Sequence, residues 1–270
     1  MFANFKNIMN KFIFCILFVI GSLFVSCVPT QDLIYLQNKN NGEAVQAVNP
    51  VSAKPYRLQT NDILNITIKT IDPQLVDMFN QTSAAQLGPS EQGLYFNGFT
   101  VDDHGNIRIP ILNEVNVLGF TLEEARLKIE KQLLEEYFTK EANVFVNLKL
   151  AGFRYTINGE VIAPGSKVLF QEKVNIMEAI ANSGDITVTG DRRDVVVIRQ
   201  MPHGTEMHSI DLTDIKAMQS PYYHLQPNDY IYVKPLKQKS WGTGTTGVQS
   251  LTTIISALSL ITTAILLITR

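Results

Sequence analysis

Residues 100–150 read TVDDHGNIRIPILNEVNVLGFTLEEARLKIEKQLLEEYFTKEANVFVNLKL, and this stretch decides the fold of the first half of the chain. Short β-branched runs at 107–111 and 114–118, and an alternating run at 142–150, predict strands. Thr121 predicts a helix N-cap, because Glu124 three residues later completes a capping box. Apolar residues at helical spacing then predict a helix with one buried stripe, formed by Leu122, Ala125, Ile129 and Leu133. Strands, a helix and a further strand indicate an α+β domain.

The domain extends upstream to about residue 55. A β-branched run at 63–68 follows the turn at Asn61-Asp62 and predicts another strand, whereas residues 72–98 show little periodicity and read as a loop. We therefore place the first α+β domain at residues 55–150.

A second α+β unit occupies residues 151–236. Gly159 and Pro164-Gly165 punctuate a pair of strands. Asn175 predicts the N-cap of a short helix at 176–182, with Glu178 at its third position. The run DVVVIRQ (194–200) predicts a buried strand, and LQPNDYIYV (225–233) ends the unit. That last sequence echoes LQTNDILNI (58–66) of the first domain, which suggests one turn used twice, with Asn-Asp side chains capping the backbone before a strand.

The N-terminus carries an export signal. Lys6 and Lys11 precede thirteen apolar residues (12–24), which is the length of a signal-peptide core and too short to span a bilayer. FVSC (24–27) resembles a bacterial lipobox, in which the cysteine is acylated after cleavage. We therefore predict a lipoprotein signal peptide at 1–26, a lipidated Cys27 and a lipid-anchored arm at 27–54 that acts as a polar tether. An ordinary cleavage site or an uncleaved anchor remains the alternative.

Composition narrows the function classes. Cleavage after residue 26 would leave Cys27 as the sole cysteine, so no disulfide framework is available and the domains must be stabilised by burial. Loss of Lys6 and Lys11 changes the formal charge from −2 to −4, with 21 basic and 25 acidic residues. A weakly acidic chain without basic blocks argues against a nucleic-acid partner.

No catalytic, metal or cofactor site is predicted. The segment His203-Gly-Thr-Glu206-Met-His208 has the most metal-like composition, but it lacks helical spacing and reads as a solvated loop. Nucleophile elbows, phosphate-binding glycine loops and Cys/His constellations are missing from the sequence. The chain is therefore not expected to be an enzyme.

Several motifs carry a resemblance to a known family. DHGNIRIP (103–110), GFTLEEA (119–125) and VFVNL (144–148) resemble the polysaccharide biosynthesis/export domain. NGEVIAPG (158–165), IMEAI (176–180) and LQPNDYIYV (225–233) resemble the SLBB domain, a β-grasp unit. Only one such unit is readable, and Gly184-Asp185 stands where the family usually has Gly-Gly.

The resemblance is to outer-membrane polysaccharide export lipoproteins. It implies a homo-oligomeric ring in the outer membrane, with its folded domains in the periplasm. Such a ring passes capsular or exopolysaccharide and works with an inner-membrane polysaccharide co-polymerase.

The C-terminal tail is apolar and rich in serine and threonine. After a linker at 237–247, residues 248–270 predict a transmembrane helix, since the eighteen apolar or hydroxyl residues at 251–268 would span about 27 Å. At 100° per residue, five polar residues fall within an arc of about 80°, namely Gln249, Thr252, Ser256, Ser259 and Thr263. With the resemblance, this stripe is predicted to line a pore. The alternative is that small hydroxyl residues let helices pack closely.

Three functions follow from these observations. The first is an outer-membrane translocation pore for polysaccharide, built by oligomerisation because one helix cannot enclose a channel. The second is a periplasmic lipoprotein that binds glycan or scaffolds a partner without forming a channel. The third is a periplasmic glycan hydrolase, for which the sequence offers no distinctive carboxylate pair.

Overall fold

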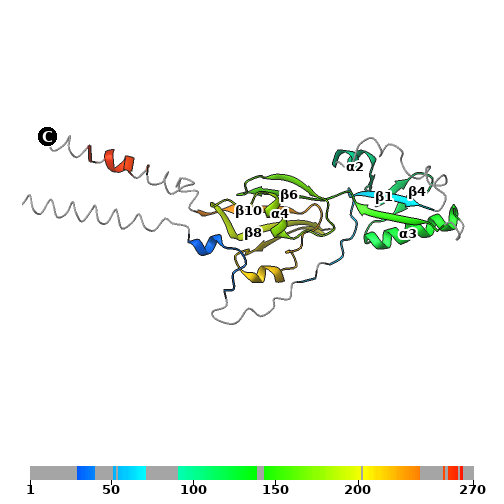
Figure 1. Cartoon of the computed structure of the whole chain (residues 1–270), viewed down its shortest axis with the longest axis horizontal. Coiled ribbons are helices and arrows are strands. Elements are labelled where there is room, and N and C mark those ends of the chain that lie inside the picture. Colours follow the sequence, from blue (N-terminus) through cyan, green and yellow to red (C-terminus); the bar gives the residue numbers. More distant parts are fainter. Residues whose placement is uncertain are drawn as a thin grey trace, which may run out of the picture.

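The structure, a computed structural model, describes residues 29–39, 51–52, 54–70, 91–138, 143–201, 203–237, 252, 255–260 and 262–263. Within these residues two separate hydrophobic cores form, one from residues 58–148 and one from residues 153–233. We call residues 54–150 the first domain and residues 151–237 the second domain (Figure 1). Both combine helices and strands, as predicted.

The first domain is built on a three-stranded antiparallel sheet. Its strand order is β2 (Phe99–Thr100), β1 (Ile63–Lys69) and β5 (Phe145–Leu150). A separate hairpin pairs β3 (Asn106–Ile109) with β4 (Asn113–Asn116).

Helix α3 (Leu122–Glu136) packs against β5 through Ala125, Ile129 and Leu133, all of them buried. The predicted capping box is present: the Glu124 N–H donates to Thr121 Oγ1 at 3.2 Å, and the Thr121 N–H donates to the Glu124 carboxylate at 2.8 Å. The sequence prediction for this helix is confirmed.

The second domain is a five-stranded mixed sheet with one helix. Along the sheet the strands are β7 (Gly165–Leu169), β6 (Phe153–Gly159), β10 (Tyr230–Pro235), β8 (Gly190–Met201) and β9 (Gly204–Ile210). The first and last strands of the domain, β6 and β10, are parallel neighbours at the centre, and the other pairs are antiparallel. This is the β-grasp arrangement predicted from the sequence.

Helix α4 (Ile176–Asn182) lies between β7 and β8 in the chain and contacts β6. Its predicted capping box is formed by Asn175 and Glu178. A 3₁₀ helix, η5 (Ile215–Gln219), connects β9 to β10.

Three local predictions were wrong. Part of the stretch predicted as a loop (72–98) forms α2 (Glu91–Asn97), a seven-residue helix that contains the buried Gly93. The segment 203–208 was predicted as a solvated loop, but its residues 204–208 belong to the edge strand β9 (Gly204–Ile210). In the described residues 29–39 of the arm predicted as a tether (27–54), the chain forms the 3₁₀ helix η1 (Thr30–Leu33) and is docked on the second domain.

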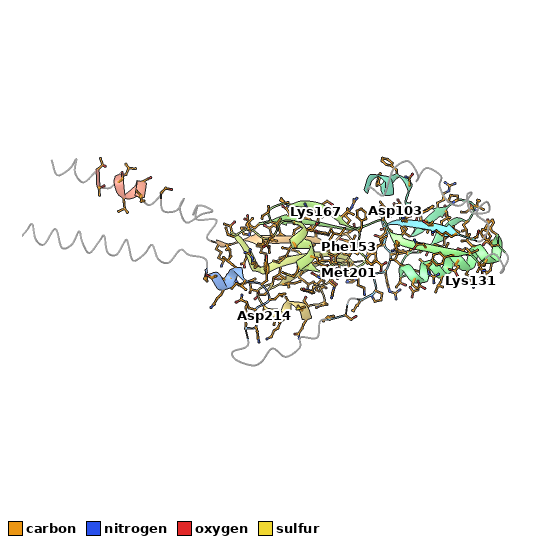
Figure 2. The ribbon with its side chains drawn as sticks, in the orientation of Figure 1. Asp103, Lys131, Phe153, Lys167, Met201 and Asp214 are labelled. Carbon is orange, nitrogen blue, oxygen red and sulfur yellow. The ribbon has the colours of Figure 1, made fainter. Side chains whose placement is uncertain are left out.

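The strand register gives the second domain two distinct ends. Gly159 pairs with Val233 and Gly190 with Pro235, so these strand ends lie together. The opposite strand ends carry Phe153 and Met201, which Figure 2 labels on the side toward the first domain. We call the end formed by loops 160–164 and 184–189, together with residues 236–237, the distal end. Figure 1 shows η1, in blue, at this end.

Candidate functional site

The related sequences LQTND (58–62) and LQPND (225–229) fold into the same turn. In each, the aspartate carboxylate accepts the backbone N–H of the glutamine three residues earlier, at 2.9 Å for Asp62 and 2.7 Å for Asp229. The preceding asparagine has a φ of 68° in both, in the left-handed region that asparagine tolerates. The leucine and aspartate of each turn are buried. The repeated sequence is therefore a repeated structure.

The two buried carboxylates have different partners. Asp229 forms a bidentate ion pair with Arg199, with Nε–Oδ1 and Nη2–Oδ2 distances of 2.9 and 2.7 Å. Asp62 instead accepts the Tyr56 hydroxyl on Oδ2 at 2.8 Å, and within the described residues no cation pairs with it. Burial raises the pKa of Asp62 and also the pKa of the Tyr56 hydroxyl, because the charged form of each group is poorly solvated.

Both turns lie where the two domains meet. A cleft of about 860 Å³ between the domains is lined by residues that include Arg57, Gln59, Leu118, Gln200, Met201 and Gln226. A smaller pocket is lined by Asn61 and Asn228, one from each turn, with Tyr95 and Arg154. Polar side chains of both domains therefore line the junction between the domains.

The N-terminal arm, residues 29–39, is held against the second domain by backbone hydrogen bonds. Leu36 N donates to Leu212 O at 2.9 Å, and Gln37 N donates to Thr213 O at 2.8 Å. The Lys39 ammonium adds an ion pair with Asp211 at 2.8 Å. Backbone N–H groups of the arm therefore bond to carbonyl oxygens of the segment that follows β9.

Tyr35 fastens the arm to the loop that follows α4. Its hydroxyl donates to the Asp185 carboxylate, and its ring lies 5.2 Å from the guanidinium carbon of Arg192. Burial, with the hydrogen bond to Asp185, raises the pKa of Tyr35 to about 12. Arg192 is itself buried and donates to Ile186 O at 2.7 Å and Thr187 O at 3.2 Å. The N-terminal arm therefore contacts the loop containing Gly184-Asp185 through the Tyr35 side chain.

The histidine-containing segment forms a surface cluster. Glu206 accepts from the Tyr222 hydroxyl at 2.5 Å and lies 3.1 Å from His203 Nε2, and these hydrogen bonds lower the pKa of Glu206. His208 stacks on the Tyr222 ring with the centroids 3.6 Å apart. Among the described residues, no group of three or more His, Cys, Asp or Glu side chains is arranged to hold a metal ion.

The predicted pore-lining residues are partly described. Thr252, Ser256, Ser259 and Thr263 are helical and exposed, whereas Gln249 lies outside the described residues, as does Cys27. Ser256 Oγ donates to Thr252 O at 2.8 Å and Thr263 Oγ1 donates to Ser259 O at 2.7 Å. Thr262, outside the predicted stripe, makes the same kind of bond to Leu258 O at 2.9 Å. Intrahelical bonding therefore does not separate the stripe from the rest of the helix. In the described part of the chain, none of the helices has the length and apolar character needed to cross a bilayer.

Comparison with known proteins identifies both domains. The model of the polysaccharide biosynthesis/export protein family matches residues 50–149, and the model of the SLBB domain matches residues 154–233. The chain therefore carries a polysaccharide biosynthesis/export domain followed by an SLBB domain. The two Asn-Asp turns (58–62 and 225–229) and both capping boxes lie within the matched segments.

Two curated relatives are named as polysaccharide export outer membrane proteins. The EPS I polysaccharide export outer membrane protein EpsA of Ralstonia nicotianae (strain ATCC BAA-1114 / GMI1000) is 29% identical over 158 residues, which cover 56% of this chain and 41% of the relative. The protein of the same name from Ralstonia solanacearum is 29% identical over 151 residues, covering 54% and 40%. The match thus spans about two fifths of the length of these curated relatives.

Two features of the structure were not predicted from the sequence. The Tyr35–Asp185 contact joins residues 150 positions apart, and the arm gave no periodic signal. The Arg199–Asp229 ion pair was also missed, although the Asn-Asp turn that positions Asp229 was recognised. A buried-strand run containing an arginine was the signal that could have prompted a search for its carboxylate partner.

Proposed function

We propose that this chain forms an outer-membrane translocation pore that exports capsular or exopolysaccharide, as a homo-oligomeric ring of lipoproteins anchored by a lipid on Cys27. The observation that carries the proposal is the match of the two domains to the polysaccharide biosynthesis/export and SLBB models, supported by relatives whose names describe polysaccharide export outer membrane proteins. The folded domains would lie in the periplasm, and an inner-membrane polysaccharide co-polymerase would be the partner. Export of this kind makes and breaks no covalent bond.

The C-terminal helix would form one part of the pore wall. Its proposed stripe of Gln249, Thr252, Ser256, Ser259 and Thr263 would face water, while aliphatic side chains such as Leu258 face lipid. These hydroxyls also donate to carbonyl oxygens of their own helix. They can therefore face either water or lipid, because few polar groups are left unsatisfied. Accessibility in the assembled protein is therefore the measurement that decides the role of the stripe.

The test uses single cysteines in the full-length, membrane-inserted protein. Ser256→Cys and Ser259→Cys are expected to react with a charged, membrane-impermeant thiol reagent, whereas Leu258→Cys is expected to be protected. The parent chain without an added cysteine gives the background from native thiols. Equal protection of all three positions would overturn the pore-lining assignment.

A second candidate is a periplasmic glycan-binding or scaffolding lipoprotein that forms no channel. The open cleft between the domains favours it, because amide side chains such as Gln59 and Gln226 line it and can hydrogen-bond sugar hydroxyls. Particle size in detergent separates the two candidates. A pore requires a large ring, whereas a detergent-solubilised monomer that binds glycan would support the second function.

A further inference from the structure

The distal end of the second domain carries an exposed aliphatic cluster. Ile34 of the arm, Ile162 of loop 160–164 and Val188 of loop 184–189 have 50%, 68% and 54% of their surfaces exposed. Soluble protein surfaces rarely gather apolar side chains without a partner. A physical reason for their exposure at this end is therefore required.

Contacts between the three segments place these side chains at one end. Ile162 N donates to Asp185 O at 3.1 Å, and a side chain at Gly184 would meet Ile162 Cβ at 3.0 Å, so loop 160–164 lies over loop 184–189. The Tyr35 hydroxyl binds the Asp185 carboxylate, which places the neighbouring Ile34 beside the same loop. The cluster is thus built by three segments that are remote in sequence.

Both apolar ends of the chain depart from this end of the molecule. Cys27 lies two residues before Pro29, where the docked arm begins, so at most about 7 Å of chain separates them. On the other side, Leu236 N donates to Thr189 O at 2.8 Å, which fixes the exit of β10 beside loop 184–189. The segment leading to the apolar residues 251–268 therefore starts here as well.

We propose that the distal end of the second domain rests on the lipid surface, with Ile34, Ile162 and Val188 inserted at the headgroup boundary. The inference rests on the proposed function, because it takes Cys27 to be lipidated. The bilayer is the occupant favoured by the short chain between Cys27 and the docked arm, since a lipid on Cys27 brings membrane to this surface. Aliphatic side chains at the headgroup boundary bury apolar area without crossing the membrane.

The Tyr35 contact gives this arrangement its orientation. A flexible tether would let the second domain turn freely beneath the membrane, whereas the arm is clamped by Tyr35 and by the Leu36 and Gln37 backbone hydrogen bonds. The lipid anchor would then hold one chosen end of the domain against the bilayer. The first domain would project away from it.

Fluorescence quenching in vesicles tests the proposal on the full, lipidated chain. Ile162→Cys and Val188→Cys are labelled with an environment-sensitive fluorophore and reconstituted into phosphatidylethanolamine–phosphatidylglycerol vesicles that contain a spin-labelled lipid. Phe170→Cys is the matched control, because Phe170 is an equally exposed apolar residue (65%) beside the first domain, where Leu169 pairs with Phe153. We expect blue-shifted, lipid-quenched emission at 162 and 188 and neither effect at 170.

Each other outcome is informative. A blue shift without lipid quenching at 162 and 188 would show that a second protein copy covers the cluster, and it would overturn the proposal. Equal quenching at all three positions would overturn the orientation. Vesicle flotation is measured on the same samples: a chain that floats with unquenched labels refutes only this inference, whereas a chain that fails to float refutes the proposed membrane location itself.

Discussion

At the scale of single residues, the turns at 58–62 and 225–229 have the same local structure in two different electrostatic environments. Asp62 and Asp229 are similarly buried, and each accepts the backbone N–H of the glutamine three residues earlier. Among the described residues, however, only Asp229 of the two forms an ion pair, with Arg199. Removing one member of a buried ion pair leaves an uncompensated charge, which is far more costly than losing a neutral hydrogen bond. The two aspartates are therefore natural controls for each other.

Asp229→Asn is expected to lower the free energy of unfolding of the second domain by about 3–5 kcal/mol, because Arg199 is left buried without its counter-charge. Asp62→Asn should cost the first domain less than about 1.5 kcal/mol, since Tyr56 can still donate to the amide oxygen. Urea denaturation at pH 7 measures both. Equal costs would show that the ion pair adds nothing beyond the shared turn.

The pH dependence of Asp62 follows from its raised pKa. A carboxyl whose pKa is higher in the folded state favours folding most below its unfolded pKa of about 3.9, and this contribution is lost as the pH rises through the folded pKa. Relative to Asp62→Asn, the parent first domain should therefore gain stability as the pH falls from 7 towards 4. Denaturation curves across that range check the sign, and a constant difference would contradict it.

At the scale of elements, the N-terminal arm behaves as an added edge on the second domain. Its backbone N–H groups bond to the carbonyl oxygens of Leu212 and Thr213, which follow β9, and Tyr35 and Leu36 pack on the second core. An arm of this length has little stability of its own, so its order depends on those few contacts. Tyr35 is the contact that also reaches the loop after α4.

Tyr35→Ala is expected to release the arm. Hydrogen exchange at the Leu36 and Gln37 amides should accelerate by at least about tenfold, which corresponds to about 1.4 kcal/mol of lost docking energy. Lys39→Ala serves as the control, because its ion pair with Asp211 is exposed and is worth at most about 1 kcal/mol. Unchanged exchange in Tyr35→Ala would mean that the backbone bonds alone hold the arm.

At the scale of the whole molecule, two cores are joined by the short link Ala151-Gly152. Neither hydrophobic core contains residues of the other domain. At the junction the two Asn-Asp turns border open clefts. Interfaces of this kind couple domains weakly. The two domains should therefore unfold separately.

Ile129→Ala tests this independence, because Ile129 is fully buried in the first core. The substitution should lower the stability of the first domain by about 2–5 kcal/mol and leave the second domain unchanged. Ile157→Ala, buried in the second core, should produce the converse. Hydrogen exchange resolved by domain in increasing urea distinguishes them, and joint loss of protection in either variant would reveal a single cooperative unit.

The amino-acid sequence by itself predicted most of the local elements and the resemblance to the polysaccharide biosynthesis/export and SLBB domains. Both capping boxes, the α3 stripe and the repeated Asn-Asp turn were readable because each depends on residues within a few positions of one another. The edge strand β9 escaped prediction because its alternating residues Glu206 and His208 are polar, and α2 because a short helix containing glycine has weak helical periodicity.

Only the tertiary structure decided what those elements do together. It places the two Asn-Asp turns at one domain junction and pairs Arg199 with Asp229. It also brings the Tyr35 hydroxyl within hydrogen-bond distance of Asp185, 150 positions away in the sequence. Such contacts leave no period in the sequence, because their spacing is set by how strands are ordered in a sheet and not by neighbours along the chain. The distal end, where both apolar ends of the chain depart, exists only because β6, β8 and β10 are aligned in that register.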